Sequence, residues 1–558
     1  MDSAVQTGWV QPPKQIGGLD HLGAQAPCIK IYSQLLPGIT NVTDRARYYS
    51  FYPWVFTEFD RNGWRAESEW APRLRRAECL LTLIAHFHSH TADDDDEHGD
   101  AMVGSNTLDK AAAQVAAGAT VRLSDFAHQD SEQGNRYFKN PYGGLGQYYF
   151  GVLEELGLLQ GESVKGLRVI KETGKVLALA VSKHVPGEDF IRTLEGDVID
   201  AERLRALSAF CFCNLKRAAE EAEYLIGVFA KGLTALHPEY VPSLEEAAAT
   251  TARAQSLSLL CNLADQAADA DVPFDVHAFS GMIYSGCNPA SERLRVPDAL
   301  QGVSATWQVY QRNELLAVAL QGLLHVQVKA LEVSGERLDN TRAFSDWFWQ
   351  ESLGHELLSN FPVSTAADVL QDLYGRLPQF ALWQEEGHEI TLMREVGSLA
   401  GREDGTLSDA LKVLRGAMTI LSALILRPEN QNGYGEFAFP PGYLQGYPVN
   451  LNTLPAAWRS ELAAQSPAAG FAQLCRRFCL DAHLRVAMRK LRQQGQNTFR
   501  FIPGEMGITV RKVPAAPNTS PRFTQAVRIL TDLGLLQRAN GLVCTTARGR
   551  QFEEQVNG

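Results

Sequence analysis

One pattern of residues occurs twice in this chain. Residues 151–177 read GVLEELGLLQGESVKGLRVIKETGKVL, and residues 528–552 read RILTDLGLLQRANGLVCTTARGRQF. In each copy an amphipathic helix ends in Leu-Gly, at Gly157 or Gly534, where glycine can adopt the left-handed conformation that ends helices. A short hairpin and a second helix follow. The repeat therefore limits the chain to folds that contain two small helix–hairpin–helix modules.

Outside the repeat, helical periodicity dominates. Residues 201–233 and 299–333 place apolar side chains at intervals of three and four over many turns. Helix, two-stranded wing and helix resemble the winged-helix domain. The predicted fold is mainly α, with a large helical body flanked by two winged-helix modules. The predicted domains are a helical region (1–135), the first module (136–186), the helical body (187–480) and a basic C-terminal module (481–558).

The composition is that of a soluble globular protein. The chain has 558 residues, of which 45% are hydrophobic and 21% charged, so several domains with large cores are expected. No apolar run approaches the roughly 18–20 residues that span a bilayer. The N-terminal residues do not resemble a secretory signal. We therefore expect a cytoplasmic protein that does not enter the membrane.

The cysteine spacing does not predict a metal site. Nine cysteines are an odd number, the closest pairs are Cys211/Cys213 and Cys475/Cys479, and no CxxC is present. Zinc sites commonly repeat such pairs at fixed spacing. The pattern favours buried, reduced thiols without disulfides, and no cofactor is expected.

Charge is distributed unevenly along the chain. The net charge is −12, yet residues 481–558 carry twelve Lys and Arg against five Asp and Glu. A basic module on an acidic body is typical of polyanion binding. We predict DNA contact through the helix that precedes the second hairpin and through its surroundings. The candidate nucleic-acid-binding residues are Arg500, Arg511, Lys512, Arg522, Gln525, Arg528, Arg548 and Arg550. The first module carries fewer basic residues and is predicted to dock partners.

The stretch HFHSHTADDDDEHGD, residues 86–100, concentrates histidines and acids. On a helix, His86 and His90 share one face at the spacing of transition-metal ligands, whereas His88 points elsewhere. Runs of acidic residues usually lie in water as mobile loops. The solvated-loop interpretation is preferred, and His86 and His90 remain outside candidates for a metal.

A second notable stretch is LLPGITNVTDRARYYSFYPWVFTEF, residues 35–59. Interleaved arginines and tyrosines can stack on single-stranded nucleic acid, but aromatic residues at helical spacing are more often core. We expect core tyrosines, with Arg45, Arg47 and Asp44 available as polar partners.

Two resemblances bear on function. The stretch just quoted, together with WQVYQRNELLAVALQGLL (residues 307–324), resembles bacterial proteins encoded in multi-gene genome-defence or mobile-element islands. That resemblance implies a partner-dependent role in defence against phages or plasmids and supplies no catalytic residues. The layout of winged helix, helical middle and winged helix is similar to that of kleisins, which bridge the ATPase heads of chromosome-organising complexes. This second likeness concerns architecture alone.

Enzymatic motifs are poor. The sequence lacks GxxxxGK[ST], HExxH and GxSxG. RFCLDAH has the spacing of the Arg–His pair of HEPN ribonucleases and makes Arg477 and His483 outside catalytic candidates. The preferred hypothesis is a non-enzymatic subunit that binds DNA and protein partners, such as an ATPase or nuclease encoded nearby. The alternatives are a HEPN-like RNase, a metal-dependent hydrolase and a large transcription regulator.

Overall fold

The computed structural model describes residues 20–93, 96–130, 132–430 and 443–558. The fold is mainly helical, with small two-stranded antiparallel sheets. Two compact units form. Unit 1 comprises residues 1–31, 279–294 and 305–519, and unit 2 comprises residues 32–278, 295–304 and 520–558. The predicted mainly helical class is confirmed, while the chain passes between the units several times.

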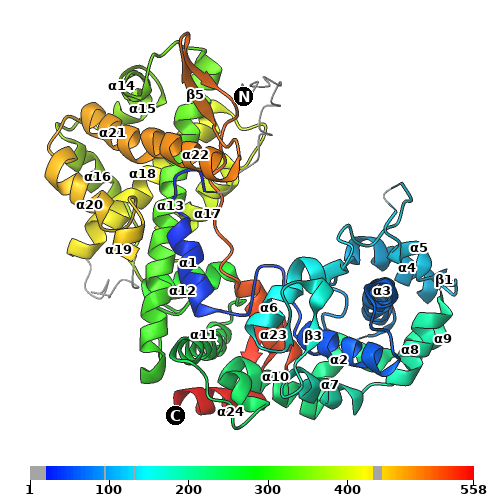
Figure 1. The fold of residues 1–558 in the computed structure, drawn as a ribbon. Helices are drawn as coiled ribbons and strands as arrows, with labels where there is room; N and C mark the ends of the chain where they lie inside the picture. Colours follow the sequence, from blue (N-terminus) through cyan, green and yellow to red (C-terminus); the bar gives the residue numbers. More distant parts are fainter. Residues whose placement is uncertain (1–19, 94–95, 131, 431–442) are drawn as a thin grey trace, which may run out of the picture. The chain divides into compact units, whose positions relative to one another are not determined.

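Unit 2 is arranged around the helix α3 (Glu67–Thr91). This helix contacts α4 (Ser105–Ala116), α5 (Ser124–Ala127), α8 (Gly187–Gly196) and α9 (Ala201–Ala206), which surround it in Figure 1. The unit also contains α2 (Arg47–Arg61), α10 (Ala219–Lys231), α11 (Leu244–Asp269) and the short strands β1 (Val121–Arg122) and β4 (Val198–Ile199), which pair with each other. Two 3₁₀ helices, η3 (Ser208–Phe210) and η4 (Phe212–Arg217), lie between α9 and α10.

The aromatic stretch around residue 50 belongs to the core of unit 2. Tyr48, Tyr49 and Tyr52 on α2 are fully buried, and Tyr48 stacks on Tyr52 with ring centroids 5.6 Å apart. The core interpretation of these tyrosines is confirmed. The expected arginines are not the hydrogen-bond partners of these hydroxyl groups. Tyr52 donates to Glu78, for example.

Both copies of the repeat fold as helix, hairpin and helix, and both lie in unit 2. The first comprises α6 (Phe150–Glu155), β2 (Leu159–Gln160), β3 (Arg168–Val169) and α7 (Gly174–Ser182), and the second comprises α23 (Phe523–Asp532), β7 (Leu536–Ala539), β8 (Leu542–Thr545) and α24 (Ala547–Asn557).

The residues that end the first helix of each copy behave alike. Gly157 and Gly534 have φ of 63° and 70°, as the Leu-Gly pattern predicts. The hydroxyl of Thr173 donates to the Gly157 carbonyl over 2.5 Å, and that of Thr546 donates to the Gly534 carbonyl over 2.6 Å. The two copies therefore share this threonine-to-glycine hydrogen bond as well as their sequence pattern.

Unit 1 has a helical core around α13 (Gln301–Ser334). Apolar side chains of α13 pack with those of α14 (Thr341–Glu351), α15 (Leu353–Leu358), α16 (Ala366–Gly375), α17 (Glu389–Ala400), α18 (Leu407–Asn430) and α21 (Pro467–Cys475). These helices are labelled in Figure 1. A π-helical turn, η8 (Arg476–Leu480), joins α21 to α22 (Asp481–Gln494), and the hairpin β5 (Phe501–Gly504) and β6 (Gly507–Val510) follows.

The helix Asp298–Ser334 is long and apolar enough to span a membrane by length and mean composition, although it contains no continuous apolar run of that length. Of its most apolar stretch, 83% is buried inside the protein. Polar residues interrupt the run, which explains why it is not continuous in the sequence. This burial is consistent with a core helix of a soluble protein.

The structure divides the chain differently from the predicted domains. The segment predicted as one basic module, 481–558, contributes residues 481–519 to unit 1 and residues 520–558 to unit 2. The first module and most of the helical region before it belong to unit 2. Sequence order did not reveal this because the C-terminal repeat folds together with segments that precede it by more than 400 residues, as the hydrogen bond from Ala46 to Asp532 illustrates.

Candidate metal centre

Four side chains of types that commonly bind metals lie close together in unit 2. They are His88 near the end of α3, His98 in the loop after it, and Cys211 and Cys213 at the start of η4. Their ligand atoms all lie within 4.8 Å of one another. Cys211 and His98 are buried, Cys213 is 9% exposed and His88 is half-buried. The group has the composition of a Cys₂His₂ zinc site.

The spacing of these atoms fits a tetrahedral ion. Zn–S bonds of about 2.3 Å and Zn–N bonds of about 2.0–2.1 Å place sulfur and nitrogen ligands about 3.5 Å apart in a tetrahedron. The distance from Cys211 Sγ to His98 Nδ1 is 3.5 Å, and that from Cys213 Sγ to His88 Nδ1 is 3.4 Å. Two of the six distances between ligand atoms therefore match a tetrahedral zinc site, and the remaining ones are at most 4.8 Å.

Arg45 holds the loop that carries His98. This guanidinium is 1% exposed and binds both carboxylate oxygens of Asp532, with distances of 3.1 and 2.9 Å. Its remaining N–H groups donate to the carbonyl oxygens of Glu97 and Asp100, each over 2.8 Å. Because these carbonyls flank His98, the arginine fixes the backbone on both sides of the imidazole.

Arg47 fixes the backbone of the segment that carries Cys211 and Cys213. It binds the two oxygens of the buried Glu221 over 3.2 and 2.9 Å. Its Nη1 donates to the carbonyl oxygens of Ala209 and Cys211 over 2.6 and 2.7 Å. Arg45 and Arg47, the two arginines of the sequence DRAR, thus position the loop of His98 and the segment of Cys211, respectively. Such outer contacts commonly orient the ligands of metal sites.

The two thiols influence each other's ionisation. A hydrogen bond with Cys213 lowers the pKa of Cys211, and Arg45 and Arg47 lower it further against the opposing effect of burial. The hydrogen bond with Cys211 and burial raise the pKa of Cys213. The Cys211 thiol therefore loses its proton more readily than the Cys213 thiol, and both would release their protons on binding a metal.

The predicted pair His86 and His90 does share a face of α3, but its partner is Asp109. His86 Nδ1 lies 3.2 Å and His90 Nε2 lies 2.9 Å from the same oxygen of Asp109, and His86 Nε2 lies 2.6 Å from Ser105 Oγ. Helical geometry separated the histidines correctly. The metal-like set, however, uses His88, which sequence reasoning had set aside.

Two residues of the acidic stretch, Asp96 and Glu97, form ion pairs with basic side chains, whereas Asp93 and Asp100 are exposed. Glu97 accepts ion pairs from Arg528 over 3.1 Å and from Arg538 over 2.9 Å, and Asp96 pairs with Lys216 over 2.7 Å. Asp94 and Asp95 lie outside the described residues. The solvated-loop interpretation is thus wrong for Asp96 and Glu97, because basic residues distant in sequence neutralise them.

The helix predicted to read DNA, α23, is packed inside unit 2. Gln525 is 8% exposed and donates to Asn41 O and Asp44. Arg528 pairs with Asp44 over 2.8 Å, and Arg522 donates to Leu36 O over 2.8 Å. In this arrangement α23 has no solvent-exposed face that could contact DNA bases. The prediction that Arg522, Gln525 and Arg528 contact DNA is therefore corrected, because they bind groups of the protein itself.

The other predicted nucleic-acid contacts differ among themselves. Arg548 donates to Leu533 O over 3.2 Å, and Arg550 lies 3.9 Å from Asp265. Arg511 and Lys512 are exposed on the segment that follows β6, whereas Arg500 is 5% exposed. Arg500, Arg511 and Lys512 belong to unit 1, whereas the other five predicted residues belong to unit 2.

Arg477 and His483 do not form an RNase-like pair. His483 is fully buried, with Nδ1 3.2 Å from the His21 carbonyl oxygen and Nε2 accepting the N–H of Arg500 over 2.9 Å. Arg477 is exposed and lies 3.3 Å from Glu461. Both ring nitrogens of the histidine serve the backbone, so this residue has no nitrogen available for proton transfer.

The metal set was missed because it depends on tertiary contact. Cys213 and His88 are 125 residues apart in sequence. The available signals were CFC and the two histidines that do not fit the face of His86, and none of these alone specifies a ligand. Comparisons with protein-family models, with curated proteins and with solved structures give no significant match to this chain.

Proposed function

We propose that this protein is a zinc-binding, non-enzymatic subunit whose Cys₂His₂ centre organises a partner-binding unit. The observation that carries the proposal is the approach of His88, His98, Cys211 and Cys213 within 4.8 Å. Sites with four protein ligands and substantial burial are structural, since catalytic zinc keeps one position open for water or substrate. The proposed metal would join α3, its following loop and η4 into one rigid element.

Zinc content tests this proposal. Purified full-length protein is expected to contain about one zinc per chain, and Cys211→Ser with Cys213→Ser is expected to lose it. Bound zinc present at a thousand times its Kd would stabilise the fold by about 4 kcal/mol, so removal by a chelator should lower the melting temperature. Cys544→Ser is the matched control, because that half-buried cysteine lies outside the set. Protein without stoichiometric metal, or metal retained by the double variant, would reject the proposal.

A second candidate function is binding of nucleic acid, and a different surface now favours it. Arg485, Arg489 and Arg492 are exposed along one side of α22 at spacings of three and four residues, with the exposed Met488 between them. Residues at these spacings are neighbours on a helix. A row of guanidinium groups of this kind can follow a phosphate backbone. We propose that DNA contact, if it occurs, uses α22 in place of α23.

Salt-dependent DNA binding tests the second candidate. Neutralising Arg485, Arg489 and Arg492 to Gln should weaken binding and reduce the slope of log K against log salt by up to about 0.9 for each lost phosphate contact. The matched control neutralises three exposed arginines of unit 2, Arg65, Arg192 and Arg295, which changes the net charge equally. Equal losses in both triple variants would indicate an unspecific charge effect and would refute the α22 surface.

The partner-binding part of the proposal concerns the repeat. Both copies have the element order of winged-helix modules, and the packing of α23 against residues 33–44 supports a docking role for the second copy in place of base reading. We propose that the protein acts with partners in a bacterial multi-component system, such as one of defence. Co-purification of the neighbouring gene products with the wild-type chain, lost on removal of the zinc ligands, is the test.

A further inference from the structure

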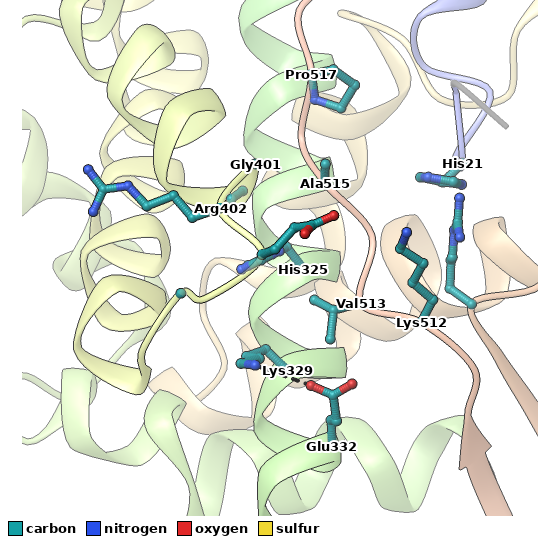
Figure 2. A pocket seen from close by; sticks show the side chains of 14 residues that line it. His21, His325, Lys329, Glu332, Gly401, Arg402, Lys512, Val513, Ala515 and Pro517 are labelled. Carbon is teal, nitrogen blue, oxygen red and sulfur yellow. Dashed lines mark hydrogen bonds and ion pairs between the residues drawn. The ribbon is translucent and has the colours of Figure 1, made fainter. Parts of the chain in front are cut away.

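A cavity of about 470 Å³ in unit 1 has an electropositive lining. It lies between α13, the turn after α17 and the segment that follows β6. In Figure 2, His325 and Lys329 lie on α13 to one side of the segment that follows β6, and Lys512 and His21 lie to its other side. Its charged lining comprises Lys329, Arg402, Arg500, Lys512, Glu332 and Glu403. Pockets of this size accept small organic ligands.

Not all of these cations are free to meet a ligand. Lys329 pairs with Glu332 over 3.2 Å, and the guanidinium of Arg402 points away from the other labelled side chains in Figure 2 and lies 3.8 Å from Asp409. No described carboxylate pairs with Arg500 or Lys512. Two unneutralised cations therefore remain at the cavity.

Of the two cations Arg500 and Lys512, only Arg500 is buried. It is 5% exposed, and its Nε is buried without a hydrogen-bond partner among the described residues, as is Nδ1 of His21. An unpaired buried charge costs several kcal/mol of folding free energy. The nearby Lys490 increases the folding cost of the Arg500 charge, because it is a second cation. The Nζ of Lys490 donates to the Asp20 carbonyl oxygen over 2.9 Å.

The backbone of this segment is well fixed. Arg500 N–H donates to His483, Arg511 N–H donates to the Arg500 carbonyl oxygen over 2.7 Å, and His325 Nδ1 lies 2.8 Å from the Pro514 carbonyl oxygen. The guanidinium is thus presented by a rigid frame, and its lack of a partner is not a consequence of a loose loop. A preorganised cation in a cavity is the usual basis of anion recognition.

We propose that this cavity binds a small phosphorylated organic molecule, with its phosphate on Arg500 and Lys512. Arginine suits phosphate because its planar N–H groups match two oxygens at once. The organic part of the ligand would contact the apolar side of the lining, which includes Ala400, Val513 and Pro517. The site goes beyond the proposed zinc-dependent role, since it lies in the other unit.

Calorimetric titration of the full-length protein tests this inference, with inorganic phosphate, a hexose phosphate and AMP as ligands and with hexose, adenosine and citrate as controls. At least one phosphorylated compound should bind, and its uncharged counterpart should bind about ten-fold more weakly or worse. Arg500→Met and Lys512→Gln should each weaken binding by about ten-fold or more. Arg511→Gln is the matched control, because this exposed neighbour does not line the cavity.

The melting temperature of the ligand-free protein supplies a second readout. Removing an unpaired buried charge should leave it unchanged or raise it in Arg500→Met, so lost binding in that variant cannot be ascribed to unfolding. Binding of the phosphorylated ligand unaffected by Arg500→Met would overturn the inference. Absence of binding by all three phosphate compounds, or binding of citrate alone, would overturn it as well.

Discussion

Arg45 in unit 2 and Arg500 in unit 1 are both buried, at 1% and 5% exposure, but their surroundings are opposite. Arg45 binds the Asp532 carboxylate through Nε and Nη2, and it binds the carbonyl oxygens of Asp100 and Glu97 through Nη1 and Nη2. Arg500 has a buried Nε without an acceptor among the residues that the structure describes, and it lies near further cations. A buried guanidinium with all its partners stabilises an architecture, whereas one without them indicates that a partner comes from outside the chain.

The largest effect expected from this comparison follows Arg45→Met. Loss of the guanidinium leaves Asp532 buried and unpaired and releases the loop of His98, so the free energy of unfolding should fall by about 3–5 kcal/mol. Zinc affinity should fall about 10–100-fold, as for other outer contacts of metal sites. Urea denaturation and a chelator competition measure the two quantities. Arg500→Met is the same substitution in the other unit, and an equal loss of stability there would break the comparison.

A smaller loss is expected where the repeat packs against its own backbone. A Cβ added at Gly174 would meet the carbonyl oxygen of Leu158, and one at Gly549 would meet that of Leu535. Alanine at either position should therefore cost about 1–3 kcal/mol by overpacking. Gly166→Ala is the control, since nothing lies within 4 Å of its added Cβ. Thermal unfolding should rank the three variants, and a tolerated Gly549→Ala would argue against the equivalence of the two copies.

Acid should affect unit 1 through the neighbours of Arg500. Burial, Arg500, His483 and Lys490 lower the pKa of His21 to about 3, and burial with the same cations lowers that of His483 to about 4. In the unfolded chain both titrate near about 6.5. As pH falls below that value the unfolded state gains protons that the folded state does not accept, so stability decreases, by about 1 kcal/mol per histidine between about pH 6.5 and 5.5.

The Arg500→Met variant sharpens this prediction. Without the cation the pKa of His21 should rise toward its ordinary value, and the loss of stability in acid should become smaller. The substitution leaves the residues of the candidate metal centre unchanged, so the difference between the unfolding free energies of wild type and variant at the two pH values isolates the contribution of unit 1. An unchanged pH dependence would show that Arg500 does not act on His21.

The smallest effect is expected from the ion pairs of Glu97 in the acidic stretch. Glu97 pairs with Arg528 and Arg538, whose side chains are 23% and 44% exposed. Exposed pairs contribute at most about 1 kcal/mol. Glu97→Gln should therefore lower stability only slightly in a denaturation experiment and should leave zinc bound, because Arg45 holds the Glu97 carbonyl and not its side chain. Loss of zinc in this variant would mean that the ion pairs, and not Arg45, position the loop.

Local patterns predicted the fold better than they predicted the site. Periodicity gave the helices, and Leu-Gly gave the ends at Gly157 and Gly534, because these features depend on neighbouring residues. Arg45, Asp532 and His98 meet only after the chain has returned over hundreds of residues. The basic residues near α23 illustrate the same limit. A positive net charge predicts a negatively charged partner, but the sequence does not show whether that partner is DNA or acidic residues of the protein itself. Here Arg528 pairs with Asp44 and Glu97 of the same chain.

X-ray absorption at the zinc edge of the purified protein tests the central claim most directly. The account predicts two sulfur ligands at about 2.3 Å and two nitrogen ligands at about 2.0–2.1 Å around each bound ion. The sulfur contribution should vanish together with the zinc in the Cys211→Ser and Cys213→Ser double variant. A protein without a zinc edge, or a zinc ion surrounded by oxygen and nitrogen alone, would contradict the assignment of His88, His98, Cys211 and Cys213 as a metal centre.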